Sequence, residues 1–132
     1  MGTALNLLLD TSTLLWIISE PARVSAPARR GLDDPRNTLW VSAASAWEIA
    51  TKHRSGRLPQ GAPLVADWYT ELGRFDFDHL PITPEHALRG GGYDIDHGDP
   101  FDLIIAAQAE LEDMVLVASD RAFDLFGVTR LW

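Results

Sequence analysis

Several features are missing from this chain of 132 residues, and each absence excludes a class of protein. There is no cysteine, which excludes a disulfide scaffold, a zinc ribbon and a thiol nucleophile, and fits a reducing compartment. No apolar run approaches the ~20 residues that a transmembrane helix needs. The N-terminal stretch lacks the basic segment and cleavage site of a signal peptide. We therefore expect a cytoplasmic protein with no membrane association.

The residues that are present have an ordinary globular composition. Hydrophobic residues make up 46% of the chain and charged residues 23%, a balance that argues against disorder. A domain of this length buries roughly two thirds of the surface that its unfolded chain exposes, so it folds without a metal or disulfide. We expect residues 1–132 to form a single domain.

Charge is distributed unevenly along the chain. The formal net charge is −8, which taken alone argues against a nucleic-acid partner. However, residues 1–60 have a net charge of +2 and residues 61–132 a net charge of −10. This asymmetry is compatible with a cationic patch, or with bound divalent metal, and also with an acidic surface that only aids solubility.

Short apolar segments alternate with amphipathic ones throughout the chain. The former are typical of buried strands, which we expect at Leu5–Leu9, Thr38–Val41, Phe77–Ile82, Met114–Ala118 and Val128–Leu131. Helices are expected at Leu14–Ile18, Pro21–Leu32, Ala43–Arg54, Pro63–Arg74, from Thr83 to a loop at Gly90–Gly92, Asp99–Leu111 and Asp120–Phe126. This order predicts an α/β fold of three layers, with helices on both faces of a central parallel sheet. In such folds the site lies beyond the carboxyl ends of the strands.

Four carboxylates fall near that edge of the predicted sheet. Asp10 and Asp120 follow two buried strands, Glu48 lies in the helix after the second strand, and Asp102 lies in the first turn of the last long helix. Crowded carboxylates repel one another, and a hard divalent cation such as Mg²⁺ or Mn²⁺ removes that conflict. An acid-only cluster of this kind suits metal-assisted hydrolysis of phosphodiesters.

Each of these acids also has a purely structural explanation. Asp99 fits the N-cap of its helix, and capping would also explain Asp102 and Asp120. Glu48 and Lys52 are spaced for an ion pair one helical turn apart. Asp10 is the hardest to explain in this way, because it directly follows a buried apolar strand and its only structural explanation is to cap the next helix. The hypothesis therefore depends on the four acids together.

Five segments in order resemble the VapC family of PIN-domain ribonucleases, the toxins of type II toxin–antitoxin systems. The segments are LLLDTSTLLW, SAASAWEIATKHRSGRL, LPITPEHAL, HGDPFDLIIAAQA and LVASDRAFDLFGV. The resemblance implies that residues 1–132 form a single PIN domain and that the activity is Mg²⁺-dependent endoribonuclease activity, with Mn²⁺ as a possible substitute. It also implies a homodimer, an RNA substrate and a cognate VapB-type antitoxin.

The resemblance assigns roles to individual residues as well. Asp10, Glu48, Asp102 and Asp120 match the catalytic acids of the family, and Asp10 and Asp102 match its principal metal ligands. We further expect Ser12, Lys52 and Arg54 to contact the RNA. His97 also matches a family position, where we expect it to line the rim of the site or to have a structural role.

This chain departs from the family pattern at three positions. Gly98 and Leu103 stand where relatives have basic residues, and Ala118 stands where relatives commonly have threonine. These changes weaken the case for tight RNA binding but leave the four acids intact. A PIN-like protein that has lost catalysis and only binds a partner is an alternative. A receiver-like signalling domain is another, but it would need paired acids after the first strand and a lysine after a late strand, and Lys52 is the only lysine.

Overall fold

Five parallel strands form one sheet at the centre of the computed structural model, which describes residues 3–96 and 98–132. The order across the sheet is β3-β2-β1-β4-β5, and the bounds are β1 (Asn6–Leu9), β2 (Thr38–Ser42), β3 (Phe77–Leu80), β4 (Val115–Val117) and β5 (Arg130–Leu131). The first strand is therefore the central one, as in doubly wound sheets. All five expected strands are confirmed, and the expectation for His97 lies outside the described residues.

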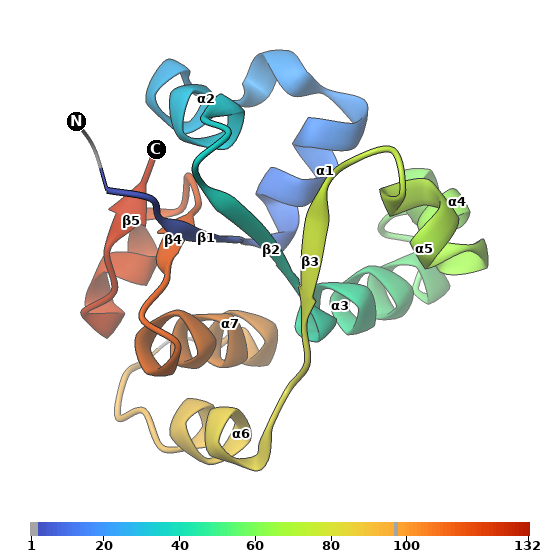
Figure 1. Ribbon diagram of the computed structural model, residues 1–132. Helices are drawn as coiled ribbons and strands as arrows, with labels where there is room; N and C mark the ends of the chain where they lie inside the picture. Colours follow the sequence, from blue (N-terminus) through green and yellow to red (C-terminus); the bar gives the residue numbers. More distant parts are fainter. Residues whose placement is uncertain (1–2, 97) are drawn as a thin grey trace.

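Helices cover both faces of the sheet, which confirms the predicted three layers (Figure 1). One face is covered by α1 (Thr11–Ser19) and α2 (Ala26–Asp33), and the other by α6 (Pro84–Gly91) and α7 (Pro100–Leu111). Beyond the carboxyl end of β2 lie α3 (Ala43–Arg54), α4 (Ala62–Ala66) and α5 (Trp68–Leu72). Short 3₁₀ turns complete the chain: η1 (Pro21–Arg23), η2 (Pro59–Gly61) and η3 (Arg121–Phe126). No helix within the described parts of the chain has the length and apolar character needed to cross a membrane.

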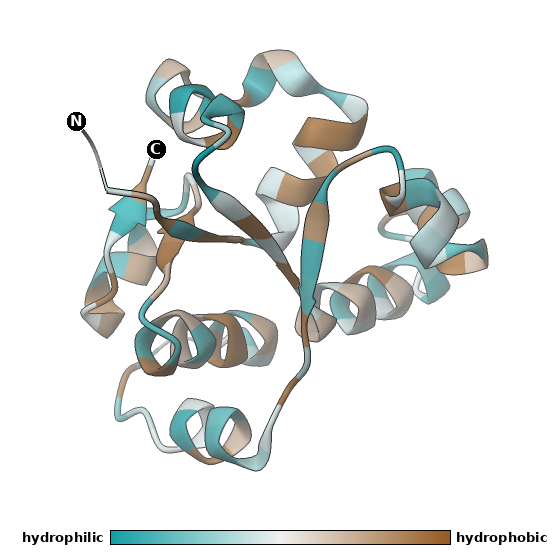
Figure 2. Ribbon diagram, viewed as in Figure 1, coloured by the Kyte–Doolittle hydropathy of each residue, from teal (hydrophilic) through white to brown (hydrophobic). Residues whose placement is uncertain are grey.

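The central strand divides the hydrophobic core in two. Side chains of a strand alternate between its faces, so Leu7 and Leu9 pack with the cluster under α1 and α2, whereas Leu8 packs with the cluster under α7. All three leucines are fully buried. Figure 2 shows the hydrophobic residues along β1 and β4. Burial on both faces fixes the register of β1, and with it the position of Asp10.

Two helices expected to be continuous are each broken in two by a polar residue. The expected helix Pro21–Leu32 is interrupted by Ser25, whose extended backbone and hydroxyl cap α2. The expected helix Pro63–Arg74 is interrupted at Asp67, where φ is −153° and the carboxylate accepts a hydrogen bond from the N–H of Thr70. In both cases the side chain satisfies a free backbone N–H and begins a new helix.

The glycine-rich segment is part of a helix, so the expectation of a loop there is wrong. Gly90 and Gly91 are the last residues of α6, and Gly90 is buried against α7. A Cβ added to Gly90 would lie 3.2 Å from the carbonyl oxygen of Leu103, whereas one added to Gly91 would meet nothing within 4 Å. The absence of a side chain at Gly90 therefore allows α6 and α7 to approach closely.

This contact predicts opposite effects for two neighbouring substitutions. Gly90→Ala should lower the free energy of unfolding by about 1–3 kcal/mol, because the new methyl group pushes against the α7 backbone. Gly91→Ala should be neutral or stabilising by up to about 1 kcal/mol, because alanine favours the helix and has space. Urea unfolding of both variants measures the difference. Equal effects at the two positions would show that the close approach of α6 to α7 is unimportant.

Candidate active site

Asp10 is held firmly at the carboxyl end of the central strand. Its backbone N–H donates to the carbonyl of Val117 on β4 at 3.1 Å, and its carboxylate Oδ1 accepts from the N–H of Thr13 at 2.8 Å. The side chain thus caps α1, which begins at Thr11, earlier than the expected start at Leu14. Asp10 is only 6% exposed. The same residue ends the strand, begins the helix and carries a buried charge.

Glu48 reaches the same region from α3 and is 5% exposed. Its Oε2 contacts the ammonium of Lys52, so the expected ion pair between these residues forms. Its Oε1 is buried and has no hydrogen-bond partner among the described residues. An unpartnered carboxylate oxygen inside a protein is costly. A cation bound beside Oε1 would remove that penalty.

Asp102, half-buried in the first turn of α7, is the third acid at this place. Burial raises the pKa of Asp10 from 3.8 to about 6. Hydrogen bonds from Thr13 oppose the rise, and the negative charges of Asp102 and Glu48 add to it. The structure therefore brings Asp10, Glu48 and Asp102, from three separate elements, into one electrostatically coupled group.

Asp120 lies apart from this group. It follows β4 at the same edge of the sheet, but its side chain is exposed and accepts a hydrogen bond from the N–H of Ala122 at 2.9 Å. It caps η3, a 3₁₀ turn where the sequence suggested a short helix. Its charge is not among those that shift the pKa of Asp10. A catalytic role for Asp120 remains a prediction.

The three residues expected to contact RNA are placed differently from one another. Ser12 is exposed in the first turn of α1, and Arg54 is exposed at the end of α3. Both are accessible to a ligand. Lys52 is half-buried and paired with Glu48, so in this structure it neutralises an acid of the site.

Sequence reasoning missed the buried hydroxyl groups that support the acids. Thr13 donates from Oγ1 to the carbonyl of Val117 at 2.9 Å, which anchors α1 to β4 beside Asp10. Thr11 and Ser45 share a hydrogen bond of 2.9 Å between their hydroxyl groups, which joins α1 to α3 three residues before Glu48. All three residues are buried. The sequence indicated that Thr11 and Thr13 follow the strand, but nothing in it paired Ser45 with Thr11.

The chemistry of these donors fits a hard divalent cation, because all of them are carboxylate oxygens. The unpartnered Oε1 of Glu48 is the observation that supports this fit. Within the described residues, however, no group of three or more His, Cys, Asp or Glu side chains is arranged so that it could hold a metal ion as it stands. A cation would have to draw the acids together and displace the Lys52 ammonium.

Comparisons with known proteins identify the family and the fold. The family profile described as "PIN domain" matches residues 7–128. Ribonuclease VapC16 of Mycobacterium tuberculosis is 38% identical over 56 residues, a match that spans 42% of this chain and only 38% of that relative. In the crystal structure of VapBC2 from Rickettsia felis bound to a promoter DNA fragment, one chain is similar with a TM-score of 0.64 at 16% identity, covering 95% of this chain and 96% of that one. The structure of VapBC-1 from nontypeable Haemophilus influenzae gives 0.61 at 16% identity with the same coverage. At these identities, the solved structures show a shared fold.

The raised pKa of Asp10 predicts a pH-dependent gain in stability for Asp10→Asn. Ionised Asp10 destabilises the folded state above its folded pKa of about 6, and this penalty is absent below 3.8, where Asp10 is protonated in both states. Asparagine keeps the helix cap without the charge. In EDTA at pH 7.5 the substitution should raise the free energy of unfolding by up to about 3 kcal/mol. The gain should shrink toward zero near pH 4.

Urea unfolding at the two pH values measures this gain. Asp34 provides a control of opposite sign, because hydrogen bonds from Arg36 lower its pKa to about 2. Asp34→Asn should therefore lose stability at pH 7.5. A destabilised Asp10→Asn variant at pH 7.5, or the same gain at both pH values, would contradict the buried-charge interpretation.

Proposed function

The chain belongs to the PIN-domain family, and on that premise we propose that it is a Mg²⁺-dependent endoribonuclease, the toxin of a type II toxin–antitoxin pair. The observation that carries the proposal is the convergence of Asp10, Glu48 and Asp102 at the carboxyl end of the central strand. The partial identity to a protein named as a VapC ribonuclease supports the reaction class. We treat residues 1–132 as one catalytic domain.

In this proposal Asp10 and Asp102 would hold the Mg²⁺, and Glu48 would either help to hold it through Oε1 or orient the attacking water. The ion, or Mn²⁺ in its place, would supply an activated water and neutralise charge on the phosphate and the leaving oxygen. Thr13 keeps the Asp10 carboxylate in one orientation through its N–H. Lys52, which contacts Glu48, would have to move aside for Glu48 to take either role.

Exposed residues have the remaining roles in this proposal. Asp120, which caps η3 apart from the three acids, would bind a bridging water or a second ion. Ser12, two residues after Asp10 on α1, and Arg54, at the end of the helix that carries Glu48, are exposed and would contact the phosphates of the RNA. Phosphate contacts by a hydroxyl or a guanidinium position the strand without reading its sequence.

The same proposal includes two protein partners. The solved structures with this fold include complexes named VapBC, and we propose that a VapB-type antitoxin silences this chain. The acidic site favours a cationic side chain from that partner, because a guanidinium bridges carboxylates with paired hydrogen bonds. We also propose that the chain acts as a homodimer in the cytoplasm.

Two acids three residues apart on α7 provide a test of the mechanism. Asp99 caps α7 by accepting from the N–H of Phe101 at 2.9 Å, whereas Asp102 belongs to the acidic group. Asp102→Asn should lower the rate of Mg²⁺-dependent RNA cleavage by about 100-fold or more, because it removes a metal ligand. Asp99→Ser should keep the rate within about threefold, because serine is an equivalent cap. Gel assays on labelled structured RNAs measure both rates.

The assay includes EDTA, which should stop cleavage by the wild-type protein, and Mg²⁺ or Mn²⁺, which should restore it. Equal losses in the two variants would show that the roles of Asp99 and Asp102 are divided wrongly. If a folded wild-type protein freed of antitoxin cleaves no RNA with either ion, the chain is a PIN-domain binding protein and the proposed activity is wrong.

A further inference from the structure

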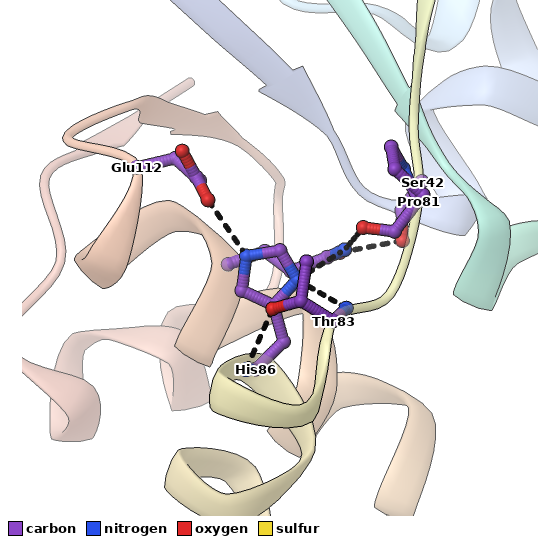
Figure 3. Close-up of polar contacts among 6 residues, drawn as sticks. Ser42, Pro81, Thr83, His86 and Glu112 are labelled. Carbon is purple, nitrogen blue, oxygen red and sulfur yellow. Dashed lines mark hydrogen bonds and ion pairs between the residues drawn. The ribbon is translucent and has the colours of Figure 1, made fainter.

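A buried chain of polar side chains links α3, α6 and α7 on the side of the sheet opposite α1 (Figure 3). The Ser42 hydroxyl accepts from the N–H of Ala44 at 2.9 Å, which caps α3, and donates to Oε1 of Gln108 at 2.5 Å. The Gln108 amide nitrogen donates to the carbonyl of Pro81 at 3.2 Å and lies 3.4 Å from Nδ1 of His86. Ser42 and Gln108 are fully buried, and His86 is 1% exposed.

The hydrogen-bond partners fix the orientation of every group in this chain. The Pro81 carbonyl only accepts, so the amide nitrogen of Gln108 faces it and the amide oxygen faces Ser42. Nδ1 of His86 accepts from the N–H of Thr83 at 3.0 Å, so the ring hydrogen lies on Nε2 and is directed to Glu112 at 2.9 Å. A satisfied buried network of this kind specifies one arrangement of its helices.

Two contacts show how α3 and α7 are aligned. The first is the hydrogen bond between Ser42, at the start of α3, and Gln108. The second is the edge-on packing of the Trp47 ring against Phe101, with ring centroids 4.7 Å apart. Trp47 comes after Ser42 in the chain, whereas its partner Phe101 comes before Gln108. The two helices are therefore antiparallel where they contact each other. Glu48 lies six residues after Ser42, and Asp102 lies six residues before Gln108. Glu48 and Asp102 therefore both lie on the same side of the Ser42–Gln108 hydrogen bond, six residues from it along the chain.

We propose that Gln108 is a positioning residue: its bond to Ser42 fixes the register of α3 against α7 and so places Glu48 and Asp102 together beside Asp10. The Ser42–Gln108 hydrogen bond joins two fully buried side chains, so a shift of one helix along the other would leave both groups without a partner. The bond therefore favours one register. Each residue of slip moves an acid by about 1.5 Å along its helix, and a displacement of about 1 Å is enough to impair a site. The inference rests on the proposed function in treating these acids as metal ligands.

Two substitutions remove the bond in different ways. Gln108→Met keeps the length of the side chain but removes its hydrogen bonds. Ser42→Gly removes the hydroxyl and retains a residue that caps helices nearly as well. Their matched controls are Ile105→Val, a buried residue of α7 outside the polar chain, and Ser25→Gly, which removes the hydroxyl that caps α2. The controls report the effect of reduced stability alone.

Two measurements read out the position of the acids. The first is the dissociation constant of Mn²⁺, from the electron paramagnetic resonance signal of the free ion. The second is the distance between nitroxide labels on α3 and α7, at Ala50→Cys and Leu111→Cys, measured without Mn²⁺. Both positions are exposed, and the wild-type chain has no cysteine, so the labels attach only there. The label distance depends on the register of the helices and requires neither metal nor RNA.

We expect one narrow label distance in the wild-type protein and a broadened or shifted one in Gln108→Met and Ser42→Gly. Their dissociation constants for Mn²⁺ should rise about 10-fold, and the controls should change neither quantity while lowering Tm. Unchanged distances in both variants overturn the proposal, and so does a broadened distance with unchanged affinity for Mn²⁺. If Gln108→Met does not fold, the Ser42→Gly variant alone tests the proposal. If the wild-type protein binds no Mn²⁺, the proposed function is wrong. The label distance then tests whether the Ser42–Gln108 bond fixes the register of the two helices.

Discussion

A negative charge buried at the carboxyl end of the central strand is the constraint on which the rest of the structure depends. Asp10 is placed there because Leu7, Leu8 and Leu9 fill the cores on both faces of the sheet and fix the register of β1. Burial and the charges of Asp102 and Glu48 raise its pKa to about 6. An isolated carboxylate is unfavourable in such a place, so the surrounding elements must supply hydrogen bonds and a cation. The N-terminus of α1 supplies the first of these.

The chain itself supplies only part of the positive charge that these acids need. Lys52 neutralises one oxygen of Glu48 and leaves the other buried and unpartnered. The unpartnered oxygen favours the binding of a divalent ion beside it. Outside the acids, α6 approaches α7 closely at Gly90, and a hydrogen bond joins Ser42, at the start of α3, to Gln108 of α7.

Much of this arrangement could be predicted from the sequence, because it follows from the order of the elements. Short apolar strands alternating with helices predict a parallel sheet, and a parallel sheet gathers the ends of its strands at one edge. The grouping of Asp10 with Glu48 and Asp102 follows from that rule and from the family resemblance. For Asp10 the sequence offered a helix cap and a site acid as alternatives, and the structure shows that one carboxylate is both the cap of α1 and a buried acid of the group.

What could not be predicted depends on contacts between distant residues. Whether Asp120 joins the acids or only caps η3 is decided by the path of the chain after β4, which periodicity does not specify. The break at Asp67 required a choice between helix and cap that local composition left open. The pairing of Ser42 with Gln108, 66 positions apart, is visible only once the helices are packed.

The central claim is that the acids at the end of β1 form a site for a divalent cation, and a crystal structure with Mn²⁺ tests it most directly through the anomalous signal of the ion. The account predicts an ion bound by the carboxylates of Asp10 and Asp102, with Glu48 completing the site and the Lys52 ammonium withdrawn from it. A structure at saturating Mn²⁺ in which Lys52 still contacts Glu48 and no ion lies among the three acids would contradict the account.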